Sequence, residues 1–341
     1  MTIVPPAPGE PRRPQGPRDP GDAWVVTSDG TRYWGRFGAA GLLAVDPERG
    51  VLLQHRVAWS HFGDTWGLPG GARHAGETAR AAALRESAEE AGVPADAVRP
   101  RLISVFDAEA WTYSTVVADV VESFEPVISD PESRELAWVP VEAVDSYPLH
   151  PGFAASWPRL RVLLPVRPAV VVDAANVVGS VPDGWWKDRA GAAARLLTEV
   201  GALASRGMDA GVLDLPERTW FPEVHVVLEG AARGAADVPA ADAPGANVPG
   251  ADVPAADAPG ANVPGADVPG ANGRGANGRG VEVVRAEGHG DDAIVTVAER
   301  LIAAGRAVTV VTSDRGLGER AAGAGAAVRP VSWLRGQLPA R

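Results

Sequence analysis

One stretch of the chain, a glycine-rich turn followed by a helix with an acidic face, limits its possible folds more than any other feature. The turn is Pro69-Gly70-Gly71, and the helix predicted after it runs over Thr78–Ala91 and stops at Gly92. Residues three and four apart share a face of a helix, and three glutamates have this spacing: Glu86, Glu89 and Glu90. Like charges at this spacing destabilise a helix, and a hard divalent cation held by oxygen ligands would offset their repulsion.

The spacing G-x5-E-x7-R-E-x-x-E-E-x-G-V, which runs from Gly71 to Val93, resembles the box of the Nudix hydrolases. The alternative interpretation is an ordinary exposed acidic helix face, and the surrounding pattern argues against it. The resemblance extends over residues 24–164 and implies an α/β/α Nudix sandwich with a mixed sheet. It also implies a Mg²⁺ or Mn²⁺ cofactor and hydrolysis of the pyrophosphate of a nucleoside diphosphate derivative. Ser87 departs from the family pattern, which prefers an aliphatic or small residue there.

The same resemblance implies roles for individual residues. The metal ligands would be Glu86, Glu89 and Glu90, with the Gly71 carbonyl as a further ligand. Arg85 would pair with Glu77 and hold the loop against the helix. The general base could be either a glutamate of the box or a carboxylate outside it, such as Glu132 or Glu135. Two aromatic residues have two alternative roles, either stacking on a nucleotide base or packing within a strand: Trp111 and Tyr113.

After Pro168 the pattern changes to alternating strands and helices, which predicts a doubly wound parallel sheet. Acidic residues follow the predicted strands or begin the predicted helices: Asp173 with Asn176 beside it, Asp291, Asp292 and Asp314. Ligand sites of doubly wound sheets lie outside the carboxyl ends of the strands, so these residues predict a second Mg²⁺ or Mn²⁺ site. The alternative is that the aspartates serve only as helix caps.

The motifs that contain these aspartates resemble those of the PIN-like NYN nuclease group. They are D-x-x-N after the first strand, G-D-D before a helix and T-S-D-R after a later strand. The resemblance implies RNA as a partner of this half, and a metal-dependent ribonuclease with an accessory Nudix half as the alternative function. Ala174 departs from the glycine that is usual there. A third hypothesis treats the Nudix half as a ligand sensor, and the presence of all three box glutamates argues against it.

The predicted organisation is a disordered tail (1–21), a Nudix domain (22–165) and a PIN-like domain (168–338) with a disordered insert (231–280). In the insert, residues 236–250 are repeated unchanged at 251–265, and their prolines are incompatible with a helix or a central strand. The chain has no cysteine, which excludes a disulfide framework and cysteine-bound zinc. Its net charge of −11 argues against broad nucleic-acid binding. The sequence shows no apolar run of membrane-spanning length and no signal peptide, so we expect a cytoplasmic bacterial protein with no membrane partner. We expect its substrate to be a nucleotide, and a homo-oligomer is possible.

Overall fold

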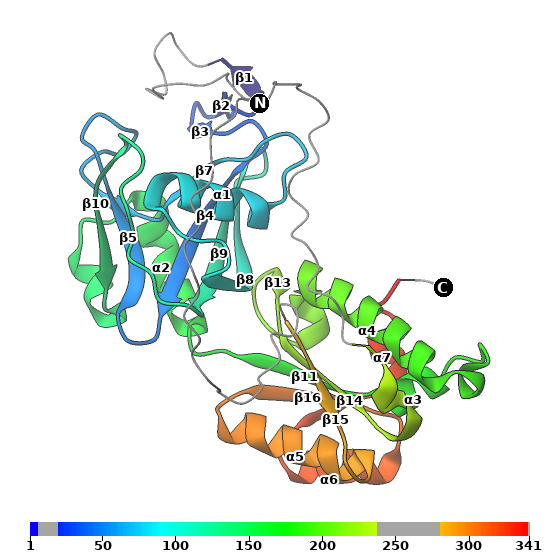
Figure 1. Cartoon of the computed structure of the whole chain (residues 1–341). Coiled ribbons are helices and arrows are strands. Elements are labelled where there is room, and N and C mark those ends of the chain that lie inside the picture. The colour runs from blue at the N-terminus through cyan, green and yellow to red at the C-terminus, as the bar shows by residue number, and fades with distance from the viewer. Residues whose placement is uncertain (6–19, 237–279, 340–341) are drawn as a thin grey trace, which may run out of the picture.

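The computed structural model describes residues 1–5, 20–236 and 280–339 and has two halves, each built on its own β-sheet (Figure 1). The strands of the first sheet are β4 (Ala39–Asp46), β5 (Gly50–Arg56), β6 (Trp66–Gly67), β7 (Gly70–Ala72), β8 (Val98–Asp107), β9 (Thr112–Val120), β10 (Ser133–Val139), β12 (Met208–Asp209) and β13 (Thr219–Trp220). The main path of this sheet is β10-β5-β4-β9-β8-β13-β12, while β6 pairs with β5 and β7 with β4. The sheet is mixed because β4 and β9 are parallel and their other neighbours are antiparallel.

Two helices cover the two faces of the first sheet: α1 (Ala79–Ala91) and α2 (Pro151–Leu163), which follows the 3₁₀ turn Val141–Ser146. Successive side chains of a strand point to opposite faces. Leu42 of β4 therefore packs with Ala82 of α1, whereas Leu43 packs with Trp157 of α2. Both cores are fully buried, which gives the three layers expected of a Nudix sandwich.

A separate sheet of three strands lies at the N-terminus and consists of β1 (Thr2–Val4), β2 (Trp24–Val26) and β3 (Arg32–Trp34). The turn of the hairpin β2–β3 contains Asp29-Gly30, a dipeptide typical of such turns, and Gly30 has a φ of 84°. The predicted disordered tail is wrong for Thr2–Val4, because this β-branched triplet pairs with β2. Residues 6–19 of that tail lie outside the described residues.

The second half has a parallel sheet of five strands: β11 (Pro168–Asp173), β14 (Glu223–Leu228), β15 (Val281–Arg285), β16 (Ala307–Val311) and β17 (Ala327–Arg329). Their order in the sheet is β15-β14-β11-β16-β17, so the chain winds first to one side of β11 and then to the other. One face is covered by α3 (Ala174–Gly179), α4 (Arg189–Arg206) and α7 (Val331–Arg335), and the other by α5 (Gly290–Ala303) and α6 (Arg315–Gly323). The predicted doubly wound parallel sheet is therefore confirmed. The finer assignment to a PIN-like fold stays a prediction.

Short 3₁₀ turns complete this half: Trp185–Lys187, Ala210–Leu213 and Gly230–Gly234. The last of them corrects the predicted start of the insert at residue 231. Ala235, which follows this turn, is 4% exposed and packs in the core beside α4, so the ordered fold continues to residue 236. The repeated segment after it lies outside the described residues. None of the helices that the structure describes is long and apolar enough to cross a bilayer.

A hairpin of the second half continues the first sheet across the junction. Its strand β13 pairs with the edge strand β8, and β12 pairs with β13. Trp220 of β13 is fully buried in the core beneath α2, together with Trp157 and Leu160. Leu213, between the two strands, packs against the cores of both halves. The boundary predicted at residues 165–168 therefore does not separate two independent sheets.

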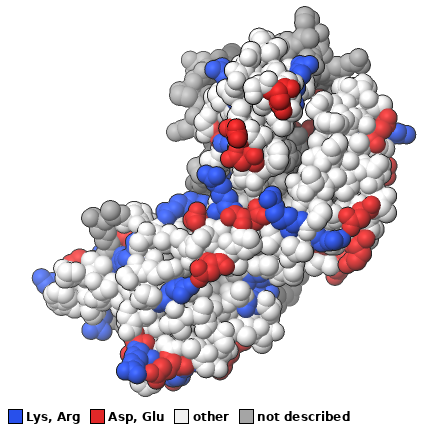
Figure 2. Space-filling view, turned by 180° about the vertical axis from the view of Figure 1, so that it is seen from behind, with Lys and Arg blue, Asp and Glu red and all other residues white. Residues whose placement is uncertain are grey.

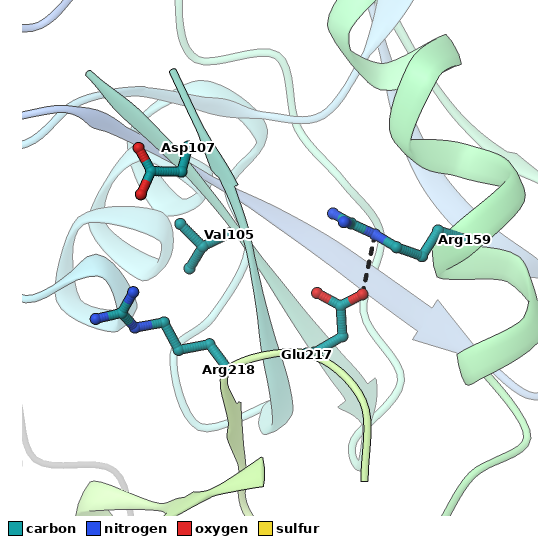
Figure 3. A pocket seen from close by; sticks show the side chains of 5 residues that line it. All are labelled: Val105, Asp107, Arg159, Glu217 and Arg218. Atoms are coloured by element: carbon teal, nitrogen blue, oxygen red, sulfur yellow. Dashed lines mark ion pairs between the residues drawn. The ribbon is translucent and has the colours of Figure 1, made fainter. Parts of the chain in front are cut away.

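Charged side chains of both signs alternate along this junction when the molecule is seen from behind (Figure 2). Arg99 and Arg306 both pair with Glu223, at 3.8 and 3.1 Å, and Arg101 and Arg167 both pair with Asp119, at 3.3 and 3.2 Å. A cavity of about 270 Å³ also opens at the junction, lined by Val105, Asp107, Arg159, Glu217 and Arg218 (Figure 3). No glutamate of the acidic helix lines it.

Candidate active site

The helix that carries the acidic face is α1. It ends before Gly92, as predicted, and Thr78, which was predicted as its first residue, is instead its N-cap. The Thr78 hydroxyl accepts a hydrogen bond from the Ala81 N–H at 3.1 Å, which satisfies one of the free donors of the first turn. Gly92 has a φ of 63°, and its N–H donates to the Ala88 carbonyl at 3.1 Å. The helix therefore has a fixed start and end, which fixes the side chains on its acidic face.

The three glutamates share a face of α1 but differ in burial. The side chains of Glu86 and Glu90 are buried, with 2% and 8% of their surface exposed. Glu89 is 54% exposed and points to Arg85, whose Nη1 lies 3.2 Å from its carboxylate. The structure therefore brings Glu86 and Glu90 together in the interior and leaves Glu89 at the rim.

The glycine turn lies directly against the two buried carboxylates. The Gly70 N–H donates to Oε2 of Glu90 at 2.8 Å. A Cβ atom on Gly71 would lie 2.6–2.7 Å from the Glu86 carboxylate, closer than real Cβ contacts allow. Only glycine therefore permits this approach of backbone to carboxylate, and it keeps the Gly71 backbone beside Glu86.

Arg85 connects the helix to the loop that precedes it. Its guanidinium donates to both carboxylate oxygens of Glu77, at 2.9 and 3.0 Å, and to the Ala72 carbonyl at 3.0 Å. It also donates to Glu86 at 2.8 Å. Burial alone would raise the pKa of Glu77, but hydrogen bonds from Arg85 and from the His74 N–H outweigh it and hold the pKa below its usual value. The pair implied for Arg85 and Glu77 is present, and it is bidentate, the stronger form of such pairs.

The electrostatics of the buried pair favour a cation. Burial, and then the negative charge of Glu86, raise the pKa of Glu90 to about 8, although the Gly70 N–H and Arg56 oppose this rise. A divalent ion would offset both the lost hydration and the repulsion. In the described part of the chain, no group of three or more Asp, Glu or His side chains already converges to hold an ion. At this site the carboxylate of Glu89 is hydrogen-bonded to Arg85.

Several groups outside the box face this pair. The charges of Arg56, on β5, and of Asp130 act on Glu90, and the charges of Glu90 and Glu86 act on Tyr113. Burial is the main cause of the raised pKa of the Tyr113 hydroxyl, which lies against Gly41, where a Cβ would collide with it. Neither Arg56 nor Asp130 was predicted from the sequence. A local signal for Arg56 is its position two residues after the run Val51–Gln54, at the end of a strand-like segment.

The two glutamates considered as the general base differ in position. Glu132 is mostly buried, and its carboxylate lies 3.7 Å from the guanidinium of Arg56, which connects it to the site. Glu135 is 61% exposed, and its nearest ion-pair partner is His55 at 4.0 Å. The geometry therefore favours Glu132 over Glu135.

Trp111 is packed rather than open to a ligand. It stacks on Tyr33 with the ring centroids 4.6 Å apart, and its Nε1 donates to the carbonyls of Trp34 and Gly35 at 3.1 and 3.0 Å. Trp111 therefore fixes the N-terminal hairpin to the first sheet.

Comparisons with known proteins place this site in a family. The NUDIX domain pattern matches residues 35–160. “Putative 8-oxo-dGTP diphosphatase 3” of Mycobacterium tuberculosis is 53% identical over 154 residues, which cover 42% of this chain and 70% of the relative. A “nucleoside triphosphate pyrophosphatase/Nudix hydrolase fusion protein” of Bifidobacterium longum is 40% identical over 153 residues, which cover 42% of this chain and 32% of the relative. A crystal structure of a Nudix hydrolase from M. smegmatis, RenU, is 49% identical, covers 42% of this chain and 94% of its own, and has a TM-score of 0.40. The chain belongs to the Nudix family, and the family pattern matches its first half.

The aspartates of the second half lie at the carboxyl edge of the parallel sheet. Asp173, which is 4% exposed, accepts hydrogen bonds from the backbone and side-chain amides of Asn176 at 3.0 and 2.8 Å and from the Thr312 hydroxyl at 2.8 Å. Asp314 accepts from the Leu317 N–H at 2.8 Å. Both therefore cap helices, as the alternative interpretation predicts.

Two of these aspartates also act on Asp291. Burial, followed by the charges of Asp314 and Asp173, raises the pKa of Asp291, so these three carboxylates are close enough to interact. Asp292 does not join them, because its carboxylate pairs with Arg320 at 2.6 Å. A cavity of about 400 Å³ lies beside the group and is lined by Ala175, Asn176, Gly179, Ser180 and Ser313.

Proposed function

We propose that the first half is a divalent-cation-dependent nucleotide pyrophosphohydrolase. One observation carries this proposal: two buried carboxylates, Glu86 and Glu90, both lie against the same glycine turn, and the charge of one acts on the other. The cation would be Mg²⁺ or Mn²⁺, since both prefer carboxylate and carbonyl oxygens. Its ligands would be Glu86 and Glu90, the Gly71 carbonyl, and Glu89 once released from Arg85.

Each group near this pair has a task that follows from its position. When bound, the cation neutralises pyrophosphate oxygens and lowers the pKa of a water molecule. Arg85 holds Glu77 and Glu86 and so fixes the loop against the helix. Arg56, which pairs with Glu132 and whose charge acts on Glu90, offers a positive charge to a phosphate group. Glu132 is our choice of general base, because Arg56 holds it beside the site.

For the substrate, we propose a purine nucleoside triphosphate with an oxidised base. The support is the name of the M. tuberculosis relative, which refers to 8-oxo-dGTP. The test is hydrolysis of 8-oxo-dGTP, dGTP, ADP-ribose and a dinucleoside tetraphosphate with each cation. We expect the highest kcat/KM for 8-oxo-dGTP, with a nucleoside monophosphate and pyrophosphate as products. A preference for ADP-ribose would refute this substrate, and no turnover of any of the four would refute the enzymatic proposal.

As a second candidate, we propose that Asp173, Asp291 and Asp314 hold another divalent cation in a PIN-like module that acts on RNA. The observation that favours it is that the charges of Asp314 and Asp173 act on Asp291, near a cavity lined by Asn176 and Ser313. The experiment is a calorimetric Mn²⁺ titration of the full chain in a Glu86→Gln/Glu90→Gln background, with and without Asp173→Asn/Asp314→Asn. Loss of Mn²⁺ binding, together with loss of RNA cleavage, would support the proposal. Identical titrations would leave the aspartates as helix caps.

A further inference from the structure

The first turn of α1 is tied to the second half of the chain by Arg80. Its Nη1 donates to the carbonyl of Ser205 at 2.6 Å, and its guanidinium lies 5.5 Å from the ring centroid of Phe221. Ser205 belongs to the last turn of α4, and Phe221 directly follows β13. The helix that carries the box glutamates is therefore in direct contact with the second half.

The position of Arg80 indicates that it serves this contact rather than its own helix. A cation in the first turn of a helix faces the positive end of the helix dipole, which is unfavourable. Carbonyls in the last turn of a helix lack intrahelical partners and carry partial negative charge. The favourable interaction of Arg80 with the C-terminal end of α4 therefore offsets its unfavourable interaction with the N-terminal end of α1.

The C-terminal end of α4 is held against the first sheet by the residues that follow it. After α4 ends at Arg206, Gly207 turns the chain with a φ of 80°, and β12 begins at Met208. A Cβ on Gly207 would lie 2.6 Å from a methyl group of Thr219, so the turn is packed against β13. Because β13 pairs with β8 and Trp220 is buried under α2, the Ser205 carbonyl is held in place by the sheet that α1 covers.

We propose that Arg80 is a positioning residue, through which the second half sets the placement of α1 and its glutamates against the glycine turn. This inference rests on the proposed hydrolase function. Glu86 follows Arg80 by six residues in the same uninterrupted helix, so a shift at the first turn moves the carboxylates as well. The Glu86 carboxylate lies so close to the Gly71 backbone that an added Cβ would collide with it, so a shift of the helix changes this contact.

The test compares two arginine contacts that both cross the junction. Arg159 pairs with Glu217 of the second half at 2.9 Å (Figure 3), and it belongs to α2, which covers the face of the sheet opposite to α1. Arg80→Met and Arg159→Met keep an apolar stem and remove the donors, and Arg80→Lys restores a donor and the charge. The measurements are kcat and KM with the best nucleotide of the panel, the melting temperature, and hydrogen exchange of the α1 amides.

We expect kcat of the Arg80→Met variant to fall by about tenfold to a hundredfold with KM nearly unchanged, because the misplaced carboxylates act on the reaction and not on base binding. Arg80→Lys should recover a large part of kcat, and Arg159→Met should keep it. Exchange in α1 should become faster in Arg80→Met alone. An unchanged kcat in Arg80→Met, or an equal loss in Arg159→Met, would overturn the inference. If the wild type hydrolyses no nucleotide, the proposed function fails, and equal α1 exchange in the two variants would then refute the positioning role separately.

Discussion

Replacement of Glu90 by glutamine should change how the stability of the metal-free protein depends on pH. Burial and the neighbouring Glu86 raise the pKa of Glu90 from an ordinary 4.5 to about 8. Between these values the folded protein keeps this carboxyl protonated, whereas the unfolded chain releases the proton. The folded state therefore binds more protons, and the contribution of Glu90 to stability, complete below pH 4.5, is lost as pH rises through 8.

The size of this effect follows from the pKa difference. Each step of one in pKa corresponds to about 1.4 kcal/mol, so the rise of Glu90 is worth at most about 5 kcal/mol. Rearrangement of the site and entry of water at high pH reduce this figure, and we expect about 2–3 kcal/mol between pH 5 and pH 8.

The assay is urea unfolding with a chelator present, at pH 5, 6.5 and 8, for the wild type, Glu90→Gln and Glu89→Gln. The comparison between variants cancels other titrating groups, such as His150, whose pKa burial lowers to about 4. The free energy of unfolding should fall with pH in the wild type relative to Glu90→Gln, and Glu89→Gln, whose side chain is half-exposed, should follow the wild type. Parallel curves for the wild type and Glu90→Gln would refute the reasoning.

Three further changes test other parts of the molecule. Glu86→Gln should lower kcat at least about a hundredfold, because a cation ligand is lost, while the protein stays folded, because a buried charge is removed. An activity assay measures kcat and a circular-dichroism melt measures folding, and near wild-type turnover would contradict the assignment. Trp220→Ala should lower the free energy of unfolding by about 3–5 kcal/mol, since a buried aromatic side chain is removed from a core; a loss below about 1 kcal/mol in urea unfolding would mean that the hairpin is not anchored. Deletion of residues 236–265 should leave the melting temperature and activity nearly unchanged, because loop closure changes by less than about 1 kcal/mol; a clear drop in melting temperature would show that this segment docks.

Helix α1 could be predicted from the sequence because its signals are local. Thr78 caps its start and Gly92 its end, and the spacing of the glutamates fixes their common face. The burial of each glutamate could not be predicted in this way. It depends on the glycine turn and on Arg85, which hold Glu86 inward and draw Glu89 to the rim.

Other features could not be predicted from the sequence, because they depend on residues that are distant along the chain. The strands β12 and β13 have two residues each, too short for any alternation of apolar and polar positions to appear. Arg56 and Asp130 approach Glu90 only because β5 and the loop before β10 meet beside α1. The strand at Thr2–Val4 was hidden by the proline-rich composition of the residues after it.

The junction explains why the two halves have to be considered together. Without β13, the first sheet would present the edge of β8 and the apolar pocket that Trp220 fills, both of which promote aggregation. The second half covers this edge with a hairpin, buries a tryptophan under α2, and reaches the box helix through the contact between Arg80 and Ser205. A change in the second half can therefore alter hydrolysis in the first without touching a box residue. For this reason the roles proposed for the glutamates and for the aspartates both require the whole chain for their test.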